Sequence, residues 1–447
     1  MIVSRLFRRV VGRILMRPDK SKEIPLPNLW LKLKQRLICD FASKELEKSV
    51  IIVKRNYDKA IERIRLKCSS GRKVRVMFLV QCTAKWKCQS VYESLANSEV
   101  FEPIIGLTVP AYSQRMSPHD TSQIIEDERA WFESRGYKCE VVYDSLKDFN
   151  IPLSRFDIDI VFFPEASYSA YHIKDLSKNS LVCYVQYYVP NYWDPFLDCG
   201  LPNHRLFYHF YSLNEDWSDL YRKTMGNVST AGAIKSVGHP MLDMIKTGRP
   251  AGVKTPHIIY APHWSFTHSG NPNFTHIGTF EWNGRFILDY AKAHPYIKWT
   301  FKPHPGLSNA LLKSGLMTPE EVKEYYADWS RIGAVCDSGD YAQLFYESSL
   351  MITDCGSFLS EYGATGKPII NLISKNRTAS IPEPSVKVFD SYYMAHNIEE
   401  LDCCLKMLIG TNVDPKADVR HDAVQASGLM SGNAGMHIVG ELQTILR

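Results

Sequence analysis

Two short polar segments carry side chains that could bind a phosphate group. One is residues 353–357, which read Thr-Asp-Cys-Gly-Ser and follow the apolar run 350–352. The other is residues 302–305, which read Lys-Pro-His-Pro and follow Trp-Thr-Phe. A short apolar run bounded by a turn indicates a buried strand. The ammonium, imidazole and hydroxyl groups at these two strand ends are donors that suit an anion.

A helix is predicted directly after the first of these segments. It covers residues 358–365 and ends near Gly366. The free N–H groups and the positive dipole end of a helix attract an anion in the preceding turn. Gly356 lets a phosphate approach the backbone, and Ser357 adds a hydroxyl donor. The alternative is that Asp354 and Ser357 only cap the helix.

The two segments together favour a site for a diphosphate. Ligands of open α/β sheets bind beyond the carboxyl ends of the strands, and both segments begin at such an end in the same half of the chain. Lys302 supplies a cation and His304 an imidazole on the same side, provided that the strand stays regular through the two prolines. The candidate nucleotide-binding residues are therefore Lys302, His304, Thr353, Asp354, Gly356, Ser357 and Glu361.

The composition sets the broad class of the protein. A chain of 447 residues is long enough for two or three domains, and its 45% apolar and 23% charged residues are ordinary for a globular protein. The net charge of +5 is too small to indicate a nucleic-acid partner. The 11 cysteines lack metal-ligand spacing, so we expect reduced thiols and no metal site. No apolar run approaches the about eighteen residues of a membrane-spanning helix.

Strands that alternate with helices predict two α/β units built on parallel sheets. The first is residues 71–245, with strands expected at 74–80, 101–109, 139–143, 158–163, 181–187, 206–211 and 234–239. The second is residues 257–447, with strands at 257–262, 299–302, 350–352 and 369–372. A linker that contains glycine and proline, residues 246–255, separates the two units.

Residues 1–70 are predicted to form an N-terminal helical extension. It begins with a basic amphipathic stretch, residues 1–17, which contains five arginines and no acid. The apolar residues of this stretch fall on one helical stripe, which predicts a helix lying in a membrane surface. A transit peptide and a helix packed on the protein itself are the alternatives. Residues 29–67 are predicted to form one or two further amphipathic helices.

Three further features bear on the site. The aromatic segment 185–193 could stack a sugar or other acceptor, or it could belong to the core. Asp157 and Asp159 resemble a metal-binding pair, but alternation along a strand also places both on one face at the strand's entry, and we assign no metal to them. The polar loop 263–277 is too long for a simple connection and is a candidate ligand-facing loop.

Several short motifs occur in a fixed order in the second half of the chain. They are Tyr260-Ala-Pro262, Lys302-Pro-His-Pro305, Asp340, the segment 350–357, Glu361-Tyr362 and Gly366-Lys-Pro368. This ordered set resembles the CDP-glycerol glycerophosphotransferase family, which is of the teichoic-acid type and has relatives in capsule assembly. The resemblance implies a fold of the GT-B type, in which two Rossmann-like domains face a cleft and the C-terminal one binds the nucleotide donor. It also implies that His304 and Ser357 contact the donor's phosphates.

The chain departs from the family pattern at three places. The family usually has two serines where Gly356 and Ser357 stand, and an aspartate where Glu361 stands. It usually has a His-Gly pair, which supplies the expected general base, where this chain has Tyr-Tyr-Val at residues 187–189. The base of any reaction must therefore come from another position.

Glu165 and His239 are the candidate catalytic residues. Each stands at the end of a predicted strand, where a side chain can reach a ligand beyond the sheet. Carboxylates and histidines are the commonest general bases, and on the same ground His172 and His204 are further candidates. A lone histidine is also compatible with a purely structural role.

The predicted function is a transferase of cell-envelope biogenesis. It would move a glycerol-phosphate or related group from a CDP-linked donor to a hydroxyl of a cell-surface glycan or lipid-linked acceptor, at the cytoplasmic face of the inner membrane. The nucleotide-linked donor is a substrate, and no separate cofactor and no nucleic-acid partner is expected. The alternatives are a glycosyltransferase that uses a nucleotide sugar, a nucleotide-sugar epimerase on the same architecture, and a binding subunit without activity.

Overall fold

The computed structural model describes most of the chain. The described residues are 44–109, 117–168, 170–226, 229–248, 255–266, 276–336, 341–377, 379–430 and 432–447. The basic stretch 1–17 and Asp340 lie outside them, as do parts of the linker 246–255 and of the loop 263–277.

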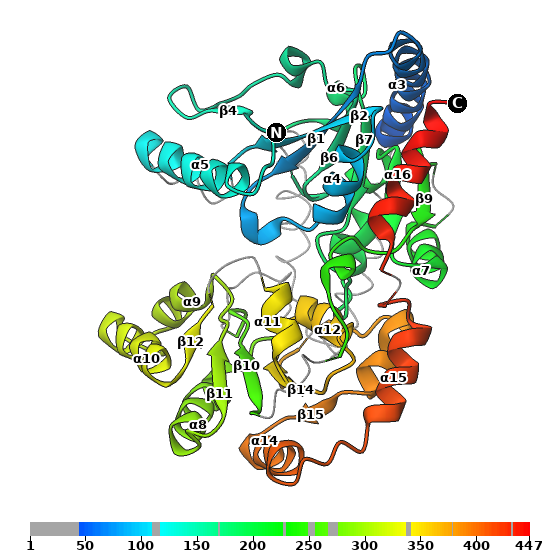
Figure 1. The fold of residues 1–447 in the computed structure, drawn as a ribbon. Coiled ribbons are helices and arrows are strands. Elements are labelled where there is room, and N and C mark those ends of the chain that lie inside the picture. The colour runs from blue at the N-terminus through cyan, green and yellow to red at the C-terminus, as the bar shows by residue number, and fades with distance from the viewer. Residues whose placement is uncertain are drawn as a thin grey trace, which may run out of the picture. The chain divides into compact units, whose positions relative to one another are not determined.

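The first half of the chain folds around a seven-stranded sheet in which all neighbouring strands are parallel (Figure 1). The strand order is β3-β2-β1-β6-β7-β8-β9. The strands are β1 (Val74–Val80), β2 (Phe101–Leu107), β3 (Cys139–Val141), β6 (Ile160–Phe163), β7 (Leu181–Val185), β8 (His209–Ser212) and β9 (Ala233–Ser236). A separate two-stranded sheet pairs β4 (Tyr143–Asp144) with β5 (Phe149–Asn150). The central strands are continuous apolar runs because helices cover both faces of a parallel sheet.

The second half folds around a six-stranded sheet, also with parallel pairing throughout. The strand order is β12-β11-β10-β13-β14-β15. The strands are β10 (His257–Ala261), β11 (Lys298–Phe301), β12 (Ala334–Val335), β13 (Leu350–Thr353), β14 (Ile369–Leu372) and β15 (Tyr393–Ala395). The two sheets confirm the prediction of two Rossmann-like α/β units.

Helices connect the strands within each unit. Those of the first unit are α3 (Lys44–Ser69), α4 (Gln89–Ala96), α5 (Pro118–Glu133), α6 (Ile173–Leu176) and α7 (Glu215–Met225). Those that follow β10 are α8 (Phe280–Ala293), α9 (Leu307–Ser314), α10 (Pro319–Ile332), α11 (Ala342–Glu347), α12 (Gly356–Gly363), α13 (Val386–Asp390), α14 (Ile398–Leu405), α15 (Ala417–Ala426) and α16 (Ala434–Ile445). We call β1–β9 with α3–α7 the first lobe, and β10–β15 with α8–α15 the second lobe. Within the described ranges, none of the helices combines the length and the hydropathy needed to span a lipid bilayer.

The last helix returns to the first lobe. In Figure 1, α16 (red) lies beside α4 (blue), and the two helices pack together. The Asp243 carboxylate accepts hydrogen bonds from the backbone N–H groups of Ala434 (2.9 Å) and Gly435 (2.8 Å), so it caps the start of α16. Gly435 lies so close to Ser90 that a Cβ there would be 2.6 Å from the serine's backbone carbon. The C-terminal helix therefore completes the first lobe.

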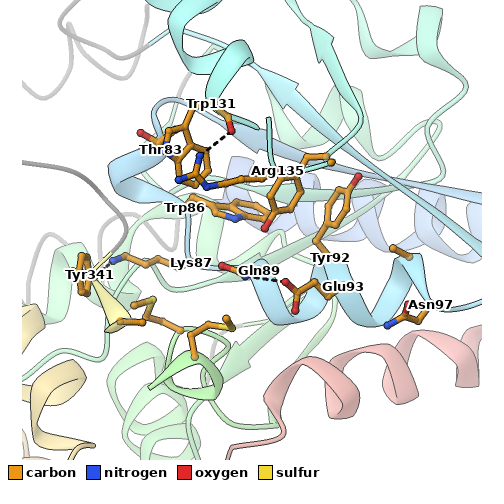
Figure 2. A pocket seen from close by; sticks show the side chains of 16 residues that line it. Thr83, Trp86, Lys87, Gln89, Tyr92, Glu93, Asn97, Trp131, Arg135 and Tyr341 are labelled. Carbon is orange, nitrogen blue, oxygen red and sulfur yellow. Dashed lines mark hydrogen bonds between the residues drawn. The ribbon is translucent and has the colours of Figure 1, made fainter. Parts of the chain in front are cut away.

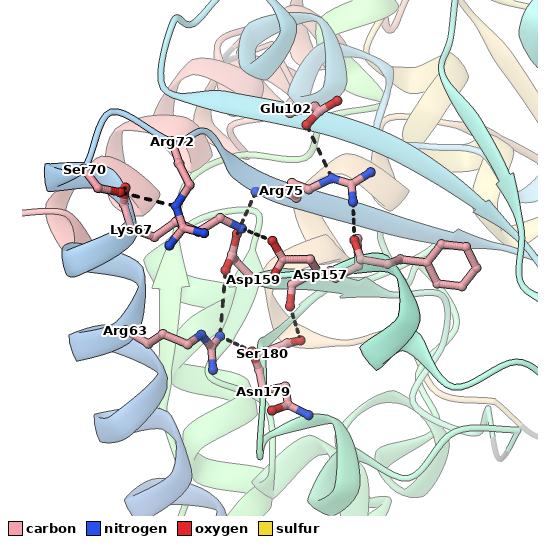
Figure 3. Close-up of polar contacts among 12 residues, drawn as sticks. Arg63, Lys67, Ser70, Arg72, Arg75, Glu102, Asp157, Asp159, Asn179 and Ser180 are labelled. Carbon is pink, nitrogen blue, oxygen red and sulfur yellow. Dashed lines mark hydrogen bonds and ion pairs between the residues drawn. The ribbon is translucent and has the colours of Figure 1, made fainter.

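The aspartate pair that resembles a metal site holds α3 to the first sheet (Figure 3). Lys67 Nζ lies 2.7 Å from Asp159 Oδ2 and 2.9 Å from Asp157 Oδ2. Asp159 Oδ2 also accepts a hydrogen bond of 2.9 Å from the backbone N–H of Arg75 on β1. The side chains of Lys67 and Asp159 are almost fully buried, whereas that of Asp157 is 72% exposed. The carboxylates thus bind a lysine at the entry of β6.

Replacing Asp159 with asparagine should destabilise the protein strongly. The change leaves the buried Lys67 ammonium without its main counter-charge, and breaking a buried ion pair costs about 3 kcal/mol or more. The measurement is the shift of the urea unfolding midpoint, followed by circular dichroism. Asp157→Asn is the matched control, because an exposed ion pair contributes only about 0–1 kcal/mol. Equal effects of the two changes would contradict this account of α3 anchoring.

Candidate functional site

Three adjacent strands of the second sheet end at the predicted anion site. Strand β10 lies between β11 and β13, so the segments that follow the three strands leave the sheet at one edge. Lys302 and His304 follow β11, His263 follows β10, and the start of α12 follows β13. Neighbouring strands are about 4.8 Å apart, so the two predicted segments are separated by about 10 Å. The structure therefore brings them together with a third segment between them.

Asp354 and Thr353 shape this edge through internal hydrogen bonds. Asp354 Oδ1 accepts from the His263 backbone N–H (2.6 Å), and Oδ2 accepts from both the N–H and the hydroxyl of Thr279 (2.6 Å each). Burial raises the pKa of the Asp354 carboxyl to about 7, although these three hydrogen bonds act in the opposite direction. The Thr353 hydroxyl donates to the carbonyl of Ala261 (2.7 Å). Asp354 thus fixes the loop after β10 and the start of α8, and Thr353 holds the end of β10.

The start of α12 faces the first lobe. The Cys355 carbonyl accepts from the N–H groups of Phe358 (3.1 Å) and Leu359 (3.3 Å), so regular helical bonding begins there. A Cβ on Gly356 would lie 2.9 Å from Cδ2 of Tyr192, a residue of the first lobe. The glycine is thus required for the approach of an aromatic ring. Its predicted role in the approach of a phosphate stays a prediction.

Lys302 and His304 lie at the same edge. Lys302 is 5% exposed, its Nζ lies 4.7 Å from the centroid of the Tyr341 ring, and burial lowers the pKa of its ammonium. His304 Nδ1 accepts the backbone N–H of Gly306 (3.0 Å), which leaves the proton of the neutral ring on Nε2. Burial, and then the charges of Lys302 and Lys85, lower the pKa of His304 to about 4. At neutral pH the ring is therefore an uncharged N–H donor.

Two lysines that sequence reasoning missed come from the first lobe. Lys87 is buried; its ammonium donates to the Tyr341 hydroxyl and lies 3.5 Å from Glu361 Oε1. Tyr341 in turn donates to Glu361 Oε2, so one connection runs from the first lobe through Tyr341 to α12. Lys85 pairs with Glu165. Both lysines follow β1, and the rule that located Lys302 at a strand end could have located them.

The candidate bases have different surroundings. Glu165, directly after β6, pairs with Lys85 and accepts a hydrogen bond from the Ser167 hydroxyl (3.1 Å), and its side chain is 32% exposed. His239 is buried, with Nε2 2.8 Å from the Gln186 carbonyl and Nδ1 accepting the Met241 N–H (3.3 Å). Burial lowers the pKa of His239 to about 4. Glu165 is thus accessible beside the basic groups, whereas both nitrogens of His239 are engaged.

The two other candidate histidines, His204 and His172, lie in different environments. His204 is buried in the first lobe, and burial lowers its pKa to about 3. His172 is exposed at the start of the short helix α6. The structure gives neither of them a contact with Lys302, His304 or α12 among the described residues.

The aromatic segment 185–193 contacts the second lobe. Asn191 Nδ2 donates to the Ser360 hydroxyl (2.5 Å) and to the Gly356 carbonyl (3.1 Å). The Trp193 N–H donates to the carbonyl of Ser380 (2.7 Å). Residues 189–193 are buried. These contacts favour the core interpretation for that part of the segment.

Comparison with solved structures identifies the fold as GT-B-like. The UDP-GlcNAc 2-epimerase from Neisseria meningitidis, bound to UDP-GlcNAc, matches with a TM-score of 0.51 at 14% identity over 83% of this chain and 100% of that one. Another UDP-N-acetylglucosamine 2-epimerase matches with a TM-score of 0.51 at 15% identity over 83% and 95%. The wall teichoic acid polymerase TagF matches with a TM-score of 0.49 at 13% identity over 88% and 98%. No protein-family model matches the chain, and no curated protein matches it significantly.

Removing the His304 ring should weaken the binding of a nucleoside diphosphate. His304→Ala deletes a donor aimed at the predicted phosphate position, and a hydrogen bond to a charged group contributes about 1.5–3 kcal/mol. Ser357→Ala should have a smaller effect in the same direction. Calorimetric titration with CDP and UDP measures both. His294→Ala is the control, because that ring lies at the end of α8 and bonds to the Tyr290 carbonyl. Wild-type affinity in both site variants would refute the proposed phosphate site.

Binding of a CDP-linked donor should strengthen as the pH falls. The free His304 has a pKa of about 4, and a phosphate placed beside it would raise that value by about 1–3. The complex then holds more protons than the free protein, so affinity rises as the pH is lowered toward the free pKa. Dissociation constants between about pH 5 and 8 measure the slope. His304→Gln should flatten it, while a slope unchanged in that variant would assign the proton to another group.

Proposed function

We propose that this chain is a transferase that moves a glycerol-phosphate or related group from a CDP-linked donor to a hydroxyl of a glycan or lipid-linked acceptor. The proposal combines two observations, the ordered motifs in the second half of the chain and the GT-B-like fold. Residues 257–447 would bind the donor, and residues 71–245 would bind the acceptor. The basic stretch 1–17 would hold the enzyme at the inner face of the membrane, where a lipid-linked acceptor is found.

One observation carries the proposal. Basic side chains from both lobes meet at the carboxyl ends of parallel strands, beside the start of α12. Lys302 and His304 come from the second lobe, and Lys85 is near enough for its charge to lower the pKa of His304. A diphosphate requires such a concentration of N–H donors and positive charge. Lys87 comes from the first lobe, and its ammonium lies 3.5 Å from Glu361 Oε1 on α12.

The proposed reaction is an attack on phosphorus. The acceptor hydroxyl forms a bond to the phosphorus that carries the glycerol, the bond from that phosphorus to the bridging oxygen breaks, and CMP leaves. Glu165 removes the proton of the hydroxyl. Lys302, the Nε2–H group of His304 and the first N–H groups of α12 stabilise the charge that develops on the leaving phosphate. Thr353, Asp354 and Glu361 hold these donors in place.

Two alternative reactions would use the same site. With a nucleotide sugar as donor, attack would fall on the anomeric carbon and a nucleoside diphosphate would leave. An epimerase would return the nucleotide sugar with one centre inverted, without an acceptor. The pairing of Glu165 with Lys85 on the acceptor side favours transfer to a hydroxyl, because an acid–base pair is placed where an acceptor would bind.

Product analysis separates these activities. The purified chain is incubated with CDP-glycerol or UDP-sugars and a lipid-linked acceptor, and we expect acceptor-dependent release of CMP. Glu165→Gln should slow the release by about 100-fold or more. Glu126→Gln, which changes an exposed acid on α5, is the control. A loss of this size in His239→Gln but not in Glu165→Gln would make His239 the base. Release of UDP, or an epimerised donor, would replace the proposed reaction with one of the alternatives.

A further inference from the structure

A groove of about 640 Å³ runs along the first lobe between α4 and the end of α5 (Figure 2). Its volume falls within the roughly 300–1,000 Å³ of small-molecule sites. One end of the groove reaches the contact between the lobes, where Lys87 extends toward Tyr341. We call this feature the α4–α5 groove. The nucleotide-binding residues predicted from the sequence are not part of its lining.

Aromatic rings form the wall of the α4–α5 groove. Trp86 lies edge-on to Tyr137, with 5.8 Å between ring centroids, and Tyr137 lies edge-on to Tyr92 at 4.6 Å. Trp86 and Trp131 line the groove and are half-buried, and the Arg135 guanidinium lies over the Trp131 ring, with its Cζ 3.9 Å from the ring centroid. Rings fixed by such contacts are rigid, flat and apolar surfaces. They match the C–H faces of pyranose rings.

The edge of the same groove is polar. Gln89 Nε2 donates to Glu93 Oε1 (2.8 Å) along one face of α4, and the exposed Asn97 follows one turn later. Amides and carboxylates together offer both donors and acceptors, which is what a set of sugar hydroxyl groups requires. A lipid chain in this position would remove these groups from water without giving them partners. The chemistry of the groove therefore fits a saccharide better than a lipid.

The α4–α5 groove borders the proposed reaction centre. Trp86 and Lys87 also line a second, small pocket of about 40 Å³ at the carboxyl ends of β1, β6 and β7. Lys85 and Pro164, the neighbour of Glu165, line that pocket as well. The groove and this pocket thus share Trp86 and Lys87 as lining residues, and the pocket lies beside the Lys85–Glu165 pair.

We infer that the α4–α5 groove binds the saccharide part of the acceptor, whose reactive hydroxyl reaches past Lys87 toward Glu165. This inference rests on the proposed transferase function and gives the acceptor its chemical class. The aromatic wall holds the sugar rings, and Gln89 and Glu93 bind their hydroxyl groups.

The test uses matched pairs of variants and chemically defined probes. Maltotriose, cellotriose and chitotriose represent saccharides, and farnesyl phosphate represents the lipid part of an acceptor. Binding is followed by the tryptophan fluorescence of the full chain and by calorimetry. The Gln89→Ala/Glu93→Ala double variant alters the groove. The Gln123→Ala/Asp127→Ala double variant removes the same kind of pair (2.9 Å) from α5, outside the groove.

We expect at least one oligosaccharide to bind, and the groove variant to bind it about 10-fold more weakly, because two hydrogen-bonding side chains are lost. The α5 variant should bind like the wild type. Equal affinity in the two variants, binding of farnesyl phosphate alone, or no binding of any oligosaccharide at about 10 mM would overturn the inference. Titration of the same proteins with CDP and UDP separates the two proposals. If the wild type binds neither CDP nor UDP, the proposed transferase function is refuted, while the result on oligosaccharide binding still holds.

Discussion

The contact of Lys87 with Tyr341 and Glu361 is the interaction on which the site depends. A buried ammonium from the first lobe meets a buried carboxylate from the second at 3.5 Å, and the Tyr341 hydroxyl bonds to both. Neither charge could stay buried alone, because an unpaired ion inside a protein costs several kcal/mol. The lobes are thus tied at the point where strand ends from both sheets approach each other. The same Tyr341 ring lies 4.7 Å from Lys302 Nζ and 4.8 Å from Lys87 Nζ, so it contacts an ammonium group from each lobe.

The local signals in the sequence predict the elements well. Apolar runs located the central strands, and the rule that ligands lie beyond the carboxyl ends of parallel strands located residues 302–305 and 353–357. The structure also shows contacts between residues that are far apart in the sequence, which a local pattern cannot predict. The partners of Asp354 are His263 and Thr279, which are 91 and 75 residues away in the sequence. No spacing rule indicates that this carboxylate bonds to a loop and to a helix start. A 3-10 turn, Thr83–Lys85, precedes α4 and places both Lys85 and Lys87 in the connection after β1, which the apolar pattern of the strand does not indicate.

The chain differs from the glycerophosphotransferase pattern at two positions that lie at the same contact between the lobes. A glycine stands at position 356 where a serine is usual, and the Tyr-Tyr-Val sequence at 187–189 stands where a His-Gly pair is usual. The segment that begins with these tyrosines continues to Asn191 and Tyr192. Asn191 donates to the Gly356 carbonyl, and the Tyr192 ring occupies the space that a side chain at 356 would need. A serine at that position would press against the ring at 2.9 Å. The smaller residue in one lobe and the larger aromatic residue in the other are thus complementary.

In the proposed reaction, this complementarity would require the base to come from a neighbouring strand. The segment after β7 is packed against α12 from Val189 onward, and burial raises the pKa of Tyr187 well above that of a free tyrosine, so this strand end supplies no proton acceptor. Strand β6 is the next strand toward β1, and its end carries Glu165. This carboxylate is partly exposed and pairs with Lys85, so it is accessible beside the basic groups. His239 follows β9 at the far side of the sheet, and its ring reaches back to bond to the Gln186 carbonyl beyond β7. The two engaged nitrogens of the His239 ring, and not its place in the sheet, therefore favour the carboxylate over the histidine.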